Sequence, residues 1–124
     1  MSDERIRDSV RAFVAAWNER DEAERARLLE RSCAVDIDLV TSGRRVRGRD
    51  ELDAMIVDFQ RRCPRLLAAF SSAIEVQGSL FRYTGVAEGT GPGAGGTALD
   101  TGACDEDGRI RVLLTFVGAV ITSA

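Results

Sequence analysis

Histidine and lysine are both missing from this chain of 124 residues, whose 17 basic residues are all arginine. Without histidine there is no Ser-His-Asp triad and no histidine-ligated metal site. Without lysine there is no lysine Schiff base and no Walker-type phosphate loop. These two absences exclude whole classes of catalytic mechanism.

Cysteine is scarce, and its three residues are far apart in the sequence, at Cys33, Cys63 and Cys104. The odd number and wide spacing favour free thiols in a reducing cytoplasm. No CxxC pair occurs, so we expect no metal and no cofactor. The acidic opening of the chain is unlike a signal peptide, and no apolar run is long enough to span a membrane. We therefore expect a cytoplasmic protein with no membrane contact.

The chain has no excess of positive charge, because its formal net charge is −3. Arginines cluster at 44–49 and 61–62, but acidic residues lie close to them and no aromatic residues interleave. This pattern indicates a solvated surface, so we expect no nucleic-acid partner. A content of 44% hydrophobic and 30% charged residues is ordinary for a globular protein, and the length predicts a single domain over 1–124.

The first half of the chain predicts three helices. Apolar residues recur at helical spacing in the first: Ile6, Val10, Phe13, Val14 and Trp17. A second helix follows Asp21, which forms a capping-box pattern with Glu24. After a strand at 34–41 and a short extended piece through Val46, a third helix is expected with Asp50 as its cap and Pro64 as its stop.

The second half predicts strands at 66–76, 79–88, 97–104 and 109–121, joined by short loops and a hairpin turn over 105–108. Short loops favour an antiparallel sheet, and helices gathered at one end of the chain favour the α+β class. The segment 91–96 matches G-x-G-x-x-G, but a strand follows it instead of a helix. We therefore interpret 89–96 as a mobile hairpin loop.

Two carboxylates stand within otherwise apolar strand segments, at Asp38 and Asp100. Burial raises the pKa of a carboxyl group, and a second carboxylate nearby separates the two pKa values. The pair is therefore the candidate for acid–base chemistry if both strands border one pocket. Asp36 lies on the same strand face as Asp38, which leaves open which of the two points inward. The alternative is that these residues are solvated at strand edges.

Three segments resemble the NTF2-like superfamily, in particular its ketosteroid isomerase and SnoaL-like polyketide cyclase branches. They are Val10–Asn18 with Asp21, Val46–Leu52 and Asp107–Ile110, in the order and spacing of that family. The resemblance implies a cone-shaped α+β fold in which three N-terminal helices pack on a curved antiparallel sheet and enclose an apolar pocket. Members are commonly dimers, so it also implies a homodimer.

The resemblance assigns roles to individual residues. Asp38 matches the isomerase's general base, and Asp100 matches the neutral acid that hydrogen-bonds the developing enolate. The oxyanion-hole tyrosine of the isomerase corresponds to Phe13, which has no hydroxyl. In such a cone Phe13 and Trp17 line one wall and Met55 and Phe59 another, while Tyr83 adds a hydroxyl. These five residues are the candidate substrate contacts.

The function that this pattern favours is cofactor-independent acid–base catalysis. Asp38 would take a proton and Asp100 would donate one, on an apolar ketone, polyketide or terpenoid-like substrate that undergoes isomerisation or cyclisation. A second enzymatic interpretation uses the same pair for epoxide hydrolysis or epoxide-opening cyclisation. A third interpretation is a non-catalytic protein that binds a small molecule or forms a dimeric scaffold.

Arg82 is expected to pair with Asp100 or Glu75.

Overall fold

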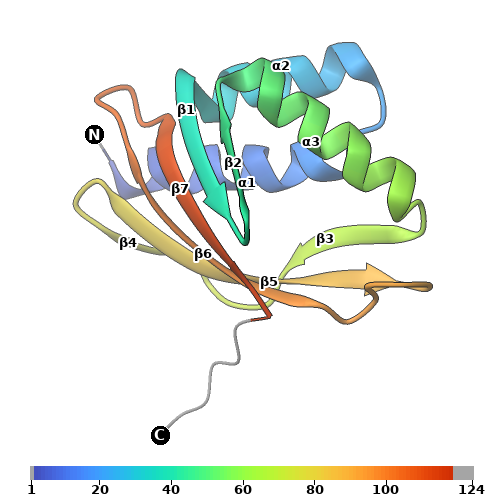
Figure 1. The fold of residues 1–124 in the computed structure, drawn as a ribbon. Helices are drawn as coiled ribbons and strands as arrows, with labels where there is room; N and C mark the ends of the chain where they lie inside the picture. Colours follow the sequence, from blue (N-terminus) through green and yellow to red (C-terminus); the bar gives the residue numbers. More distant parts are fainter. Residues whose placement is uncertain (1, 119–124) are drawn as a thin grey trace, which may run out of the picture.

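The computed structural model describes residues 2–118 and combines three helices with one strongly curved sheet (Figure 1). The helices are α1 (Asp3–Asn18), α2 (Glu22–Ser32) and α3 (Arg49–Arg62). The strands are β1 (Cys33–Thr41), β2 (Arg44–Arg47), β3 (Leu66–Phe70), β4 (Glu75–Gln77), β5 (Leu80–Gly89), β6 (Thr97–Cys104) and β7 (Ile110–Val117). All three helices lie on one side of the sheet (Figure 1). The predicted α+β cone is confirmed.

The predicted helix caps have different outcomes. Asp21 caps α2 as expected, because its carboxylate accepts a hydrogen bond from the Glu24 amide at 2.9 Å. The predicted cap at Asp50 is wrong. Gly48 precedes α3 with φ of +84° and provides no side-chain cap, while Asp50 lies inside the first turn. There its negative charge faces the positive end of the helix dipole.

The strands form a sheet in the order β2-β1-β7-β6-β5-β3, with β4 also paired to β5. The expectation of a wholly antiparallel sheet is corrected by one pair, since β1 and β7 run parallel. Hairpin loops impose antiparallel pairing only on strands that follow one another in the chain. β1 and β7 are separated by α3 and five strands, which leaves the chain long enough to return in the same direction.

The strand predicted over 66–76 is two strands, β3 and β4, that pair with different parts of β5. Between them the hydroxyl of Ser72 accepts a hydrogen bond from the Thr84 amide at 2.8 Å, and the Ser71 hydroxyl donates to that of Thr84 at 2.9 Å. The Ser72 hydroxyl thus takes the place of a strand backbone at this bend. The predicted hairpin turn over 105–108 is present, with Gly108 at φ of +78°. Positions 119–121 of the predicted last strand lie outside the described residues.

The core forms where the apolar stripes of the helices meet the inner face of the sheet. Its fully buried members include Ile6 and Val10 of α1, Ile56 of α3, Ile37 of β1 and Leu113 of β7. The helical spacing of these side chains places them on one face of each helix. No helix within residues 2–118 is long and apolar enough to cross a membrane.

Candidate functional site

A cavity of about 420 Å³ lies between α1, α3 and the inner face of the sheet. Its lining is almost wholly apolar: Phe13, Val14, Trp17, Leu39, Thr41, Met55, Phe59, Cys63, Leu66, Ala68, Ala69, Tyr83, Gly85, Val86, Ala87, Gly93, Gly96, Thr97, Ala98, Asp100, Thr115 and Val117. The volume is within the range of small-molecule sites, which is roughly 300–1,000 Å³.

All five side chains predicted as substrate contacts line this cavity: Phe13, Trp17, Met55, Phe59 and Tyr83. The aromatic rings among them support one another. Trp17 makes edge-to-face contacts with Phe13 and with Phe59, at centroid distances of 6.4 and 5.5 Å. Phe13 and Met55 are buried, and Trp17 is partly exposed. The helical spacing that places Phe13 and Trp17 on one face of α1 therefore also aims both at the cavity.

Asp100 is the one carboxylate among the lining residues within 2–118. It pairs in register with Tyr83 on β5 and with Thr115 on β7, so the three side chains form a polar row across the sheet. The Tyr83 hydroxyl donates a hydrogen bond to Oδ2 of Asp100 at 2.6 Å. The other carboxyl oxygen, Oδ1, is buried and has no hydrogen-bond partner among residues 2–118.

Burial governs the protonation of this row. Loss of hydration raises the pKa of Asp100 above its usual value, and the hydroxyls of Tyr83 and Thr115 oppose that rise by hydrogen bonding. Burial also raises the pKa of Tyr83 well above its usual value, and the neighbouring Asp100 carboxyl adds to the effect. Tyr83 therefore remains a protonated donor, while Asp100 is the group suited to gain and lose a proton.

Asp38 lies on the opposite face of the sheet from the cavity. Its carboxylate accepts two hydrogen bonds from Arg45, at 2.8 and 2.6 Å, and lies 4.0 Å from Arg47. The hydrogen bonds from Arg45 hold the pKa of Asp38 below its usual value. Asp36 is exposed as well. The expectation that Asp38 and Asp100 share a pocket is therefore wrong, and neither aspartate of β1 faces inward.

The alternation of side chains along β1 explains this placement. Ile37 and Leu39 are fully buried, so the residues between and beside them must point outward. Ile37 and Leu39 lie on the inner face because burial of two branched aliphatic side chains is favourable. Burial of the carboxylates of Asp36 and Asp38 would instead be costly. An irregularity in the pairing of β1 with β7 between Cys33 and Asp38 displaces the start of the strand and obscures the alternation in the sequence.

Arg82 pairs with Glu75, which was one of its two expected partners, through contacts of 3.1 and 3.2 Å. Within the described part of the chain it makes no hydrogen bond or ion pair with Asp100. In the same part of the chain, no three Cys, Asp or Glu side chains gather closely enough to hold a metal ion. The wall of the cavity thus carries a carboxyl group and hydroxyls as its reactive oxygens.

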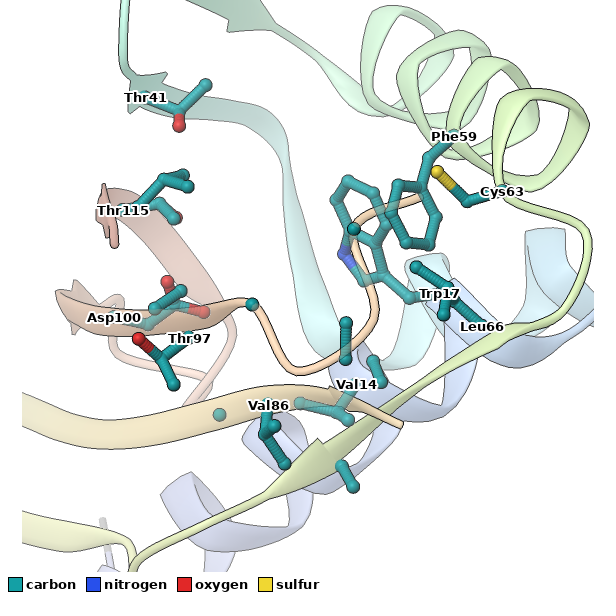
Figure 2. Close-up of a pocket in the computed structure, with 18 of the residues that line it drawn as sticks. Val14, Trp17, Thr41, Phe59, Cys63, Leu66, Val86, Thr97, Asp100 and Thr115 are labelled. Atoms are coloured by element: carbon teal, nitrogen blue, oxygen red, sulfur yellow. The ribbon is translucent and has the colours of Figure 1, made fainter. Parts of the chain in front are cut away.

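The threonines on the polar side of the cavity were not predicted from the sequence. Figure 2 shows Thr41, Thr97, Asp100 and Thr115 on one side, and Trp17, Phe59, Cys63 and Leu66 on the other. The threonines come from β1, β6 and β7, and no local pattern distinguishes them from other strand threonines. Only the register of the strands, which sets Thr115 beside Asp100, could identify them. Gly93 and Gly96 of the glycine-rich loop also line the cavity.

Solved structures of other proteins share this architecture. A provisionally assigned isomerase of the SnoaL-like family from Agrobacterium tumefaciens has a TM-score of 0.80 at 18% identity, over 94% of this chain and 99% of that chain. A SnoaL-like protein of unknown function from Burkholderia thailandensis has 0.74 at 16% identity, over 96% and 99% of the two chains. A provisionally assigned polyketide cyclase from Sinorhizobium meliloti has 0.70 at 19% identity, over 87% and 93%.

No protein-family profile and no curated protein sequence matches this chain. The structural neighbours therefore establish a fold, and at these identities they carry no activity with it.

Proposed function

We propose, from the premise that the chain has the SnoaL-like fold, that it is a cofactor-independent acid–base enzyme for a neutral, mostly apolar small molecule. The substrate class is a ketone, polyketide-like or terpenoid-like molecule, and the reaction is an isomerisation or a cyclisation. One observation carries this proposal. A buried carboxyl group of raised pKa, Asp100, faces an otherwise apolar cavity and is fixed there by a tyrosine hydroxyl.

In the proposed reaction Asp100 is the proton-transfer group. As a carboxylate it removes a proton from a carbon next to the substrate carbonyl or from a nucleophilic hydroxyl, and as an acid it returns the proton elsewhere. Tyr83 positions the carboxyl group by donating a hydrogen bond to Oδ2 at 2.6 Å. A raised pKa makes the carboxylate a stronger base than an exposed aspartate, and so better matched to a weakly acidic carbon.

The charge of the cavity supports a neutral substrate. No arginine is among the lining residues within 2–118, so the described wall offers no counter-ion for a phosphate or a carboxylate. An anionic group beside the buried Asp100 would add like-charge repulsion to the loss of hydration. The apolar side of the cavity, with Trp17, Phe59 and Leu66, instead suits a hydrocarbon ring or chain.

A binding protein without catalytic activity is the second candidate function. It is favoured by one observation, namely that the described lining of the cavity has one carboxylate, whereas acid–base chemistry by a carboxylate pair requires two. Epoxide opening by paired carboxylates is not proposed, because Asp38 and Asp100 lie on opposite faces of the sheet. Catalysis and binding differ in whether a bound ketone exchanges its protons.

The test is exchange of the α-hydrogens of a bicyclic ketone, trans-2-decalone, in D₂O, followed by NMR. We expect the protein to accelerate exchange above the rate in buffer. The Asp100→Asn variant should lose about 100-fold or more of this acceleration, since that is the usual size of a general-base contribution. The Asp38→Asn variant is the matched control, and it should retain the rate because its side chain lies outside the cavity.

Each other outcome has a definite meaning. Exchange that survives in Asp100→Asn would overturn the assignment of the base. Equal loss in both aspartate variants would assign Asp38 a role that its position does not explain. Tight binding of the ketone without any exchange in the wild-type protein would favour the binding protein, and absence of both would refute the proposed substrate class.

A further inference from the structure

We propose that Trp17 donates a hydrogen bond from its indole N–H to the substrate oxygen that gains negative charge when Asp100 removes a proton. This inference rests on the proposed function and adds a second catalytic group to it. It arises from the position of the ring, from its unused donor and from the geometry of proton removal next to a carbonyl.

The Trp17 ring is held in place from several directions. Phe13, on the same helix α1, contacts the ring edge to face, and Phe59 of α3 makes a second edge-to-face contact. The backbone also is fixed near the end of α1, because the buried Gln60 donates from Nε2 to the Trp17 carbonyl at 3.1 Å and to that of Glu19 at 2.8 Å. A ring held this way can present a donor without losing much conformational freedom on substrate binding.

The indole nitrogen has no use in the protein itself. An indole N–H can only donate, and buried or half-buried tryptophans usually find a partner for it. Within residues 2–118 the Trp17 nitrogen makes no hydrogen bond, although the ring lines the cavity. In Figure 2 the nitrogen lies on the ring edge turned toward the side of the cavity that carries Asp100. The donor is thus aimed into the space that a ligand would fill.

The hydroxyl groups near Asp100 are less suited than the Trp17 indole to donate a hydrogen bond to the substrate oxygen. Tyr83 already donates to the carboxyl group, and Thr115 lies beside Asp100 in register and helps to lower its pKa. Phe13, at the position expected for the isomerase's tyrosine, has no hydroxyl to donate. Trp17 lies four residues further along α1, about one helical turn away, and its ring contacts that of Phe13 directly. Trp17 therefore takes the donor role that Phe13 cannot fill, from the same wall of the cavity.

The geometry of the reaction requires the base and the donor to come from different walls. A base removes an α-proton roughly perpendicular to the carbonyl plane, whereas a donor approaches the carbonyl oxygen close to that plane. Asp100 is on the sheet and Trp17 is on a helix across the cavity (Figure 2). A flat carbonyl group between them can meet both requirements at once.

Proton removal converts the bound ketone into an enolate. The C–H bond breaks, its proton goes to an Asp100 carboxylate oxygen, and its electron pair forms a carbon–carbon double bond. The π pair of the carbonyl moves to the oxygen, which becomes an enolate. The indole keeps its proton and only hydrogen-bonds the oxygen. Because the cavity is apolar, this bond strengthens as charge develops, which lowers the barrier more than it tightens binding.

Trp17 is the only tryptophan in the chain, which makes a direct readout possible. With ¹⁵N-labelled protein, its indole N–H gives a single tryptophan side-chain signal. We expect trans-2-decalone to move this signal downfield, as a hydrogen bond to the carbonyl forms. The matched hydrocarbon, trans-decalin, should bind in the same cavity without that downfield shift. Equal shifts with both ligands would overturn the inference.

The kinetic test compares Trp17→Phe with Asp100→Asn in the decalone exchange assay. Trp17→Phe keeps an aromatic ring and removes the donor, so we expect kcat to fall on the order of 100-fold, as for loss of one oxyanion donor. Affinity for trans-decalin should change little. Exchange lost in Asp100→Asn but retained in Trp17→Phe would refute the donor role alone, whereas exchange retained in both would refute the proposed function. If Trp17→Phe fails to fold, the wild-type indole signal still decides.

Discussion

At the residue scale, one hydrogen bond sets the chemistry of the cavity. The Tyr83 hydroxyl reaches Asp100 at 2.6 Å and favours its charged form, while burial favours the neutral form. Burial is the larger influence, so the pKa of Asp100 stands above its usual value. Tyr83 thereby limits how far the pKa rises and keeps the carboxylate available as a base.

This balance predicts the effect of Tyr83→Phe on pH dependence. Removal of the hydroxyl takes away a group that lowers the pKa of Asp100, so that pKa should rise further. Because the base must be ionised, the acid limb of the kcat/KM profile should move to higher pH, and activity at acidic pH should fall. Decalone exchange measured across pH checks this. Thr115→Val should shift the limb in the same direction, and a shift to lower pH in either variant would contradict the account.

At the element scale, the end of helix α1 holds the edge strand of the sheet. The Asn18 side chain donates from Nδ2 to the Ala68 carbonyl at 2.8 Å and accepts from the Ala68 amide at 2.7 Å. β3 is the last strand in the sheet order, so this side chain satisfies backbone groups that would otherwise be unpaired. Leu66, Ala68 and Ala69 of β3 line the cavity, which makes Asn18 a support for its wall.

We expect Asn18→Ala to lower the free energy of unfolding by about 1–3 kcal/mol, because it leaves a partly buried amide and carbonyl without partners. Urea unfolding measures the loss, and hydrogen exchange at the Ala68 amide should become faster. Asn18→Asp is the matched comparison, since it keeps the acceptor for the amide and loses the donor for the carbonyl. It should fall between the wild type and Asn18→Ala. Unchanged exchange at Ala68 in Asn18→Ala would show that the contact does not hold the strand.

At the scale of the whole molecule, the two faces of the sheet have different roles. Leu39, Thr41 and Thr115 line the cavity, so their neighbours Val40 and Leu114 point to the other face. Phe116 joins them there, with 54% of its surface exposed. Val40 and Leu114 are paired in register, which makes the exposed residues contiguous. Contiguous exposed apolar residues often mark an interface.

We therefore expect a homodimer that buries this outer face, in line with the most frequent oligomeric symmetry of soluble proteins. Light scattering coupled to size-exclusion chromatography should give twice the chain mass. Phe116→Glu should shift the species to the monomer, because it places a charge in the apolar contact. Leu67→Glu, an equally exposed leucine on β3, is the matched control and should leave the mass unchanged. A monomeric wild-type protein at all concentrations would refute the expectation.

Local signals in the sequence predicted the three helices, most of the strands and the fold class. The helical spacing from Ile6 to Trp17, the Asp21 cap and the glycine-containing turns are local signals, and local signals act through neighbouring backbone atoms. The resemblance to SnoaL-like proteins was confirmed at the level of fold. Phe13, Trp17, Met55 and Phe59 line the cavity as predicted, because the apolar face of an amphipathic helix faces the interior whatever its neighbours are. Tyr83 of β5 lines it as well.

Which carboxylate lines the cavity and which strands pair depend on the tertiary structure. Asp38 and Asp100 look alike in the sequence, but the face that each strand turns inward depends on register, and a single irregularity reverses it. The parallel pairing of β1 with β7 and the row of Tyr83, Asp100 and Thr115 join residues far apart in the chain. Such contacts are fixed by the packing of the whole sheet against the helices, which no local pattern in the sequence records.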